Sequence, residues 1–412
     1  MKYRSPVGRK EGLMKRKPTK LIAWIVFGCL VANLAYSQEQ ANSNFGGPDT
    51  AENRLAAEFD SWDEWKKKLQ TDHGFGFGVD YTGVFLSASE ALDSDTASGG
   101  ILRAYGAWEL TDNGAFVWKF EHRHKYGSLS PFDFSLGSLG YVGLHEPPFN
   151  NSKFRTQNLF WRQRFGGGRS ALVAGVLDPT DFLDLYGLIS PWLHFMNFAF
   201  STGSATIGLP NDAAVGVGYG TMLTDNYYLI ASLTDTNGDP SDPLKGFGNF
   251  FNDNEYFSSV EFGWTTADEA IYLDNYHVTV WHKDRQVEAN VNGGWGVNFS
   301  FARFVDQQWM PFLRGGYAND GGSLLQKSLS GGIGWKTVAF DGLLGAGVNW
   351  GQPNEETFLP GLDDQYAIEV FYRVPILQKF AVTVDTQLIR NPALNPDAST
   401  IWMFNLRARG AF

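Results

Sequence analysis

Apolar and polar residues alternate along the C-terminal segment, residues 399–412. One parity carries Trp402, Phe404 and Leu406, while the other changes from apolar residues to Asn405 and Arg407. Successive side chains of a β-strand point to opposite faces, so the segment is predicted to be a strand with one apolar face and one face that meets water from residue 405 onward. This pattern is typical of a transmembrane β-barrel, although a strand of a soluble sandwich would alternate in the same way.

The same alternation recurs in further segments between His73 and the C-terminus. Each places aromatic or branched apolar residues on one parity and charged or amide residues on the other: Phe75–Thr82, Phe116–Lys125, Asn158–Phe165, Tyr366–Arg373 and Val382–Leu388. Because charged side chains need water, we assign the charged parity to the inside of a barrel and the apolar parity to lipid.

Long polar segments rich in Gly, Asn, Asp and Pro separate the predicted strands. We expect external loops at Ser87–Gly100, Gly127–Ser152 and Thr234–Asn254, and a short turn on the other side at Thr111–Gly114. One segment differs, because residues 51–69 place Leu55, Phe59, Trp62, Trp65 and Leu69 at helical spacing. This short amphipathic helix is predicted to pack on the barrel rim or to plug its mouth, with a partner-binding helix as the alternative.

Residues 1–37 are predicted to be a secretory signal peptide. The apolar stretch of about 15 residues is shorter than the roughly 20 that a helix needs to span a bilayer, so a permanent helical anchor is the weaker interpretation. Met14 is an alternative start, and cleavage before the single cysteine, Cys29, as in a lipoprotein, is disfavoured by the bulky Phe27. The signal consists of a basic region (Lys15, Arg16, Lys17 and Lys20), the apolar stretch (residues 21–35) and small residues at the cleavage site (residues 35–37).

Charge and composition narrow the class of protein. The whole chain has a formal charge of −11, and residues 1–37 hold eight Lys and Arg and one Glu, so their removal would leave −18. Such an acidic chain is not expected to bind nucleic acid, whose phosphates require a basic surface. The 63 aromatic residues (33 Phe, 16 Tyr and 14 Trp) suit the interfacial girdles of a barrel, and the 47 glycines suit its turns and bends.

The chain is long enough for a barrel of about 16 strands. A tilted strand crosses the bilayer with about 9–11 residues, so 16 strands would use about 160 of the residues that follow the signal peptide. The rest would supply the helix, turns and loops. Barrels of 14 or 18 strands would fit nearly as well. We therefore predict residues 1–37 as signal peptide, 38–72 as a periplasmic segment with the helix, and 73–412 as an all-β transmembrane barrel.

Sequence motifs of enzymes and metal sites are largely missing. The chain has no G-x-S-x-G, H-E-x-x-H or P-loop motif, so no catalytic residues are assigned. The glycines of residues 216–220 are interpreted as small strand residues. His122 and His124 share a strand face with aromatic residues and are interpreted as interfacial side chains. Residues 235–239 (DTNGD) resemble the start of a calcium loop but place Pro240 where that loop requires glycine. We therefore expect no metal and no cofactor.

Several short sequence blocks carry a resemblance to a known family. VLDPTDFLD at 176–184 is followed by FAF at 198–200, TDNYYL at 224–229 and DTNGD at 235–239, and QLIRNP at 387–392 leads into LRAR at 406–409. In this order the blocks resemble the carbohydrate-selective porin family of the Gram-negative outer membrane. GGILR at 99–103 and the helix before His73 resemble its N-terminal part, whereas residues 142–152 match no pattern of the family. The resemblance implies a 16-stranded barrel with a constricted pore for sugars, but it does not supply a sugar site residue by residue.

The parity assignment supplies candidates for the pore lining. A lumen that carries both charge signs can replace the hydration of sugar hydroxyls, and weak binding permits passage. The candidates are Arg103, Glu109, Lys119, Glu121, Arg123, Arg162, Arg164, Glu369, Arg373, Asp385, Gln387 and Arg407.

The expected function is passive, selective diffusion of carbohydrates across the outer membrane. A general or anion-preferring porin and an outer-membrane hydrolase are the alternatives. Phe412 is predicted to be part of an assembly signal. The expected partners are carbohydrate substrates, outer-membrane lipid and the barrel-assembly machinery. The sequence leaves both a monomer and a homotrimer open.

Overall fold

The computed structural model describes residues 60–210, 213–377 and 379–412, all within one compact unit. The predicted signal peptide, with Met14 and Cys29, and residues 51–59 of the predicted helix lie outside the described residues. Within the described residues the chain forms sixteen strands: β1 Phe75–Ala88, β2 Thr96–Thr111, β3 Gly114–Lys125, β4 Lys153–Phe165, β5 Ser170–Leu177, β6 Ala214–Met222, β7 Tyr227–Asp235, β8 Tyr256–Thr265, β9 Asn275–Lys283, β10 Gly294–Ala302, β11 Trp309–Asp320, β12 Leu325–Lys336, β13 Leu343–Pro353, β14 Gln365–Leu377, β15 Phe380–Arg390 and β16 Thr400–Ala411.

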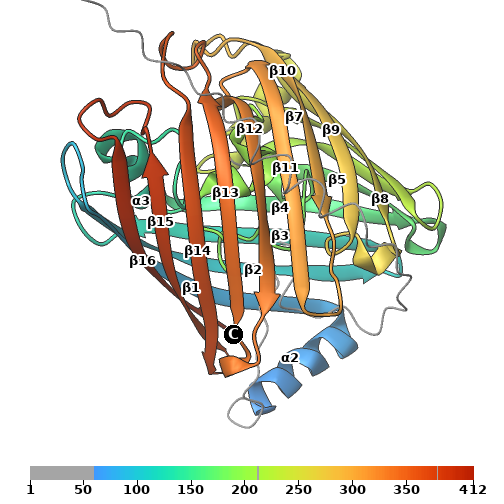
Figure 1. Cartoon of the computed structure of the whole chain (residues 1–412). Coiled ribbons are helices and arrows are strands. Elements are labelled where there is room, and N and C mark those ends of the chain that lie inside the picture. Colours follow the sequence, from blue (N-terminus) through green and yellow to red (C-terminus); the bar gives the residue numbers. More distant parts are fainter. Residues whose placement is uncertain (1–59, 211–212, 378) are drawn as a thin grey trace, which may run out of the picture. The chain divides into compact units, whose positions relative to one another are not determined.

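The sixteen strands form one closed antiparallel barrel (Figure 1). Each strand pairs with its neighbours in the sequence, and β1 closes the barrel by pairing with β16 from Asp80↔Ala411 to Ala88↔Met403. The backbone of Phe412 extends this seam, because its N–H and C=O both bond to Val79. Closure leaves no strand edge unpaired. The predicted fold class and the count of about 16 strands are therefore confirmed.

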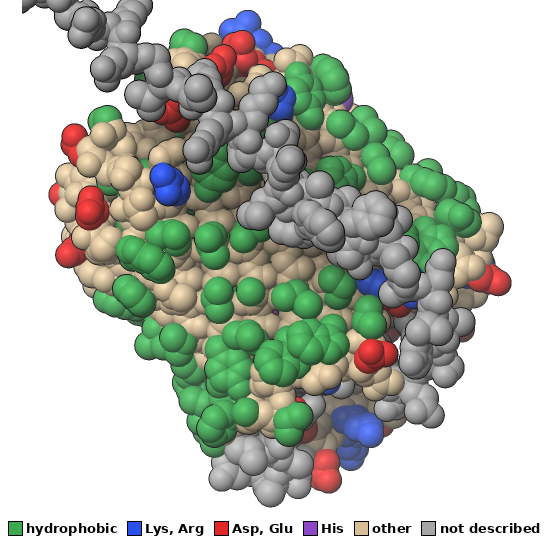
Figure 2. Space-filling model, in the orientation of Figure 1, with side chains coloured by type: hydrophobic (Ala, Val, Ile, Leu, Met, Phe, Trp, Pro, Cys, Tyr) green, Lys and Arg blue, Asp and Glu red, His purple; other side chains and the backbone are tan. Residues whose placement is uncertain are grey.

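The two parities of the strands face opposite sides of the barrel wall. In β16, Trp402, Phe404 and Leu406 are exposed on the outside, whereas Asn405 and Arg407 are buried on the inside. Figure 2 shows hydrophobic side chains spread over the strands of one outer face, with most visible charged side chains around its edge. The charged parity that alternation shows in the sequence is therefore the inward face of the strand.

The connections at the two ends of the barrel differ in length. Residues 96–100 of the predicted first loop belong to β2, so the connection is only 89–95, and the turn after Thr111 is as short as expected. Long connections run over 126–152, with helix α3 Pro131–Asp133, and over 236–255, with helix α4 Pro243–Asn252. The longest, 178–213, was not predicted as a loop, because its buried apolar run lacks the polar character of the others.

A short helix, α2 Asp60–His73, precedes the first strand. The rings of Trp62 and Trp65 pack edge-on against Phe77 of β1, with centroids 6.0 and 5.9 Å away. Asp63 forms an ion pair with Lys379, in the turn between β14 and β15. These contacts place α2 on the barrel rim. Within the described residues the helix continues past the predicted end at residue 69, to His73. In the part of the chain that the structure describes, no helix is long and apolar enough to cross a membrane.

Candidate functional site

The connection 178–213 folds into the barrel and packs against its inner wall. Phe195 contacts Phe200 of the same connection at a centroid distance of 4.7 Å. It also contacts Phe371 of β14 at 5.0 Å and Phe312 of β11 at 5.6 Å. Both strand residues lie on the inward parity and are fully or almost fully buried. The apolar run of the connection therefore finds its core inside the barrel instead of in a separate domain.

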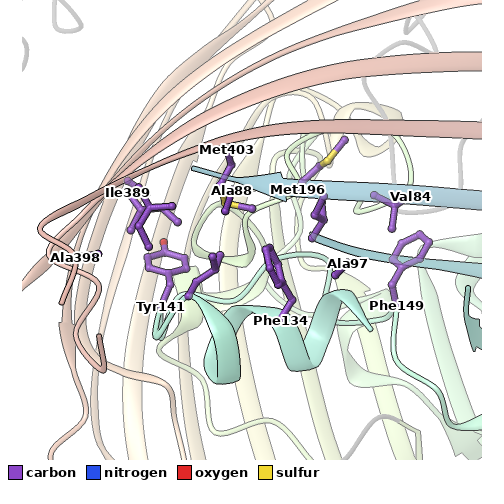
Figure 3. Packing of buried hydrophobic residues seen from close by; sticks show 14 of the residues in the cluster. Val84, Ala88, Ala97, Phe134, Tyr141, Phe149, Met196, Ile389, Ala398 and Met403 are labelled. Carbon is purple, nitrogen blue, oxygen red and sulfur yellow. The ribbon is translucent and has the colours of Figure 1, made fainter. Parts of the chain in front are cut away.

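The connection 126–152 also enters the barrel. Figure 3 shows its helical segment with Phe134 and Tyr141 packed beside residues of the barrel wall. Met196 of connection 178–213 belongs to the same buried cluster. The wall contributes inward-facing residues of five strands to this cluster, among them Val84, Ala88, Ala97, Ala367, Ile389 and Met403. The two inserted connections thus support each other as well as contacting the strands.

Asp184 anchors the beginning of connection 178–213. Its buried carboxylate accepts hydrogen bonds from His277 Nε2 at 2.8 Å, from the Arg314 guanidinium and from the backbone N–H of Gly203. Burial alone would raise the pKa of Asp184, but Arg314 and His277 hold this pKa below its usual value. The carboxylate therefore stays charged and ties the connection to β9 and β11.

Two of the predicted lining residues hold connection 178–213 through backbone groups. Glu369 accepts bonds from the N–H groups of Met196 and Asn197 at 2.6 and 3.0 Å. Arg407 donates to the carbonyl oxygens of Pro191 and His194 at 2.8 and 2.7 Å. Glu369 and Arg407 thus satisfy loop backbone that would otherwise be buried without partners. A third, Gln387, accepts from the side chain of Asn197 at 3.2 Å through its Oε1.

Arg407 and Gln387 also contact two adjacent residues of connection 126–152. Arg407 donates to Glu146 at 2.8 Å, and His145 Nε2 donates to Gln387 Oε1 at 2.8 Å. Burial raises the pKa of Glu146 to about 8 and lowers the pKa of His145 to about 4. Neutral His145 suits its fully buried position, where a charged imidazole would be costly.

Arg103 links the barrel wall near the seam between β1 and β16 to Trp192 of connection 178–213. Asp80 accepts from Arg103 at 2.9 and 2.7 Å and from Arg409 at 2.8 Å. The guanidinium of Arg103 lies 4.0 Å from the ring centroid of Trp192. A guanidinium over the face of an indole ring is attracted by the negative charge of that face. Nearby on the wall, Asp385 accepts from Asn405 at 2.6 Å.

A cavity of about 460 Å³ remains between the inner face of β3 and β4 and the two inserted connections. This volume lies within the range of small-molecule sites, about 300–1,000 Å³. Its lining combines both charge signs, amides and aromatic rings: Lys119, Glu121, Arg123, Asp133, Arg155, Asp178, Asp181, Asn150, Asn151, Gln157, Asn197, Phe132, Trp192, Phe195 and Phe198.

Two of the cationic side chains of the cavity are bound to carboxylates. Lys119 Nζ lies 2.6 Å from Asp181, which also accepts from Asn158 at 2.6 Å. Arg123 contacts Glu121 at 2.7 Å. The lining holds three cationic side chains, of Lys and Arg, and four carboxylates. It is therefore polar and hydrogen-bonding without an excess of positive charge.

The structure divides the predicted lining residues into three groups. Lys119, Glu121 and Arg123 line the cavity. Five others contact the inserted connections or their supports on the wall: Arg103, Glu369, Asp385, Gln387 and Arg407. The remaining four lie toward the end of the barrel that carries α2, where Glu109 and Arg162 pair at 2.6 Å, and do not line the cavity: Glu109, Arg162, Arg164 and Arg373.

Several residues of the cavity were missed from the sequence. Asp178, Asp181 and Trp192 belong to connection 178–213, whose apolar run without strand periodicity could have indicated a buried loop. Arg155 and Gln157 precede the alternating part of β4, and a shift of register opposite Lys119 and Phe120 changes the parity there. A bulge of this kind cannot be read from alternation alone.

The histidine pair and the acidic loop do not form metal sites. His122 and His124 lie on the outward face of β3 with ring centroids 5.4 Å apart. Asp235 is buried at the end of β7 and caps the N–H of Asn237 at 3.1 Å, which differs from the solvated loop that the sequence predicts. Among residues 60–210, 213–377 and 379–412, no group of three or more His, Cys, Asp or Glu is placed to hold a metal ion.

The barrel is similar to those of solved porin structures. The high-pH structure of Pseudomonas putida OprB aligns with a TM-score of 0.67 and 12% identity over 88% of this chain and 99% of that chain. The anion-selective porin from Comamonas acidovorans gives a TM-score of 0.52 and 11% identity over 82% of this chain and 98% of that chain.

A mutant of the Rh. blastica porin gives a TM-score of 0.50 and 10% identity over 82% of this chain and all of that chain, 100%. No protein-family model matches the sequence, and a search of curated proteins finds no match. At these identities the likeness shows a shared barrel fold.

Proposed function

We propose that the protein is a passive channel of a Gram-negative outer membrane that selects neutral carbohydrates. The closed barrel with an apolar outside and a polar inside supports the membrane location, because closure satisfies all backbone groups of the wall in lipid. The observation that carries the proposal is the cavity of about 460 Å³ inside this barrel, with paired charges, amides and aromatic rings in its lining.

The chemistry of the cavity favours a neutral polyol. Each sugar hydroxyl can donate and accept, so carboxylates, amides and cationic side chains can replace its hydration in turn. Trp192 and Phe198 add apolar ring surface to the same cavity, which suits the C–H faces of a sugar ring. Short-lived binding of this kind permits diffusion down a gradient without trapping the solute.

The anion-preferring alternative is less well supported by the charges of the inner wall. Lys119 and Arg123 pair with acidic neighbours in the cavity. Arg103 and Arg409 lie outside the cavity and share the carboxylate of Asp80. An anion path requires cationic groups that are not already neutralised.

Assembly by the barrel-assembly machinery, the role of Phe412 in it and a homotrimer remain predictions.

Liposome swelling tests the proposal. Liposomes that contain the protein should swell rapidly in isosmotic glucose or maltose and slowly in gluconate, because the cavity carries no positive excess. Glu121→Gln should increase gluconate entry, because it frees the charge of Arg123 from its partner. Glu109→Gln, outside the cavity, is the matched control and should leave both rates unchanged. Faster entry of gluconate than glucose into wild-type liposomes would support the anion channel instead.

A further inference from the structure

Helix α4 lies on the outer face of the barrel. It contacts β6 and β7, and a Cβ on Gly246 would lie 2.9 Å from the side chain of Val215. Val215 and Val176 stand on the outward parity of β6 and β5, yet they are buried in one cluster with Phe250 of α4. The connection 236–255 therefore turns away from the lumen and covers part of the outer wall, unlike the other two long connections.

The apolar side of α4 is wider than the part that the barrel wall covers. Gly246 and Phe250 face the wall. Leu244, Phe247 and Phe251 recur at three- and four-residue spacing, continue the same apolar side beyond the wall, and are 77%, 44% and 72% exposed. An apolar helix side of this kind needs cover along its whole width.

The wall beneath α4 is formed by short strands. β5 has 8 residues, and β6 and β7 have 9 each, as do β9 and β10, against 16 in β2. A tilted strand needs about 9–11 residues to cross the hydrocarbon core, so β5 falls just below this length and β6 and β7 just reach it. The covered residues Val176 and Val215 lie within two positions of the strand ends that border connection 178–213. Helix α4 thus adds apolar surface at the ends of strands that barely span this core.

Lipid is the occupant that this surface fits best. The outward side chains beside α4 are aliphatic and exposed, as in Val217, Leu233 and Val260, so the exposed side of the helix continues the lipid face. A protein partner usually buries about 800 Å² per subunit, more than a helix of 10 residues offers by itself.

We propose that α4 is an interfacial helix whose exposed side, Leu244, Phe247 and Phe251, is immersed in the acyl chains of the outer leaflet and extends the lipid-facing band above β5–β7. The inference rests on the outer-membrane location proposed above. Lys245 and Asn252, seven residues apart, share the polar side of the helix, and the proposal places this side toward water. The arrangement matches amphipathic helices that lie in the plane of a bilayer surface.

Nitroxide labels in lipid vesicles test this inference. Phe251→Cys and Leu244→Cys are each made in a chain with Cys29→Ser, labelled, and measured for collision with oxygen and with a water-soluble nickel complex. Val280→Cys, on the outward face of β9, is the lipid control, and Lys245→Cys is the control on the polar side of α4. Heat-modifiable mobility on a gel confirms that each labelled protein is folded.

The labels at Phe251 and Leu244 should resemble the one at Val280, with collisions with oxygen exceeding those with nickel, and the label at Lys245 should show the reverse. Nickel access at both Phe251 and Leu244, with Val280 still in lipid, would overturn the inference about α4 and leave the proposed membrane location intact. Low access to both reagents, with dipolar coupling between labels of separate chains, would show that a second copy covers α4 and would also overturn it. Nickel access at Val280 would instead contradict the membrane location.

Discussion

Asp184→Ala is expected to release the first part of connection 178–213 and to give a larger, noisier single-channel conductance. The substitution leaves Arg314 and His277 buried without their shared carboxylate. Removal of one partner of a buried ion pair costs about 3–5 kcal/mol. The strand pairing of the barrel does not depend on this contact, so folded yield should persist while the inserted connection loses an anchor.

Hydrogen exchange and conductance together measure this effect. Backbone amides of residues 185–205 should exchange faster in the variant, while those of the strands stay protected. Asp225→Ala is the matched control, because it removes an exposed ion pair with Arg169 that contributes about 1 kcal/mol or less. Unchanged exchange and conductance in Asp184→Ala would show that Asp184 does not hold the connection inside the barrel.

Phe120→Arg is expected to impair insertion of the barrel into vesicles far more than Arg123→Gln. Phe120 stands on the outward face of β3 between the rings of Trp118 and Phe154, at 5.8 and 5.9 Å. A cationic side chain facing lipid near the bilayer midplane costs about 2–4 kcal/mol. Arg123 faces the polar cavity, where a neutral amide is tolerated.

The folded yield of both variants is measured by heat-modifiable gel mobility after refolding into vesicles. Glu121→Gln, one residue from Phe120 on the inward parity, serves as a second inward control. If Phe120→Arg refolds as wild type and Arg123→Gln does not, the two faces of β3 are assigned the wrong way round. The same result would remove Lys119, Glu121 and Arg123 from the pore lining.

Local alternation was enough to predict the two faces of six of the sixteen strands, β1, β3, β4, β14, β15 and β16. In β3 and β16 the charged parity of the sequence is the inward face, because a strand has only two faces and only one tolerates lipid. The strand count followed less firmly, since 14 or 18 strands would use a similar length of chain. Closure at β1 and β16 depends on register between the two ends of the sequence, which no local pattern contains.

The candidate site was predicted only in part, because its contacts are long-range. Arg407 was placed inside correctly, but its partner Glu146 lies 261 residues away in the sequence. The path of connection 178–213 through the lumen depends on the space that the closed barrel leaves. Its apolar run alone therefore did not show whether the connection lies inside or outside the barrel. Trp192 and Asp181 entered the cavity with that connection and could not be named beforehand.

Titration of single-channel conductance with neutral sugars tests the central claim most directly. The purified protein in a planar bilayer should conduct ions, and glucose or maltose should reduce the current saturably with a half-maximal concentration in the millimolar range. An affinity of about 1 mM corresponds to about −4 kcal/mol, which biases passage without trapping the solute. A stable ion conductance that no mono- or disaccharide reduces would contradict carbohydrate selection.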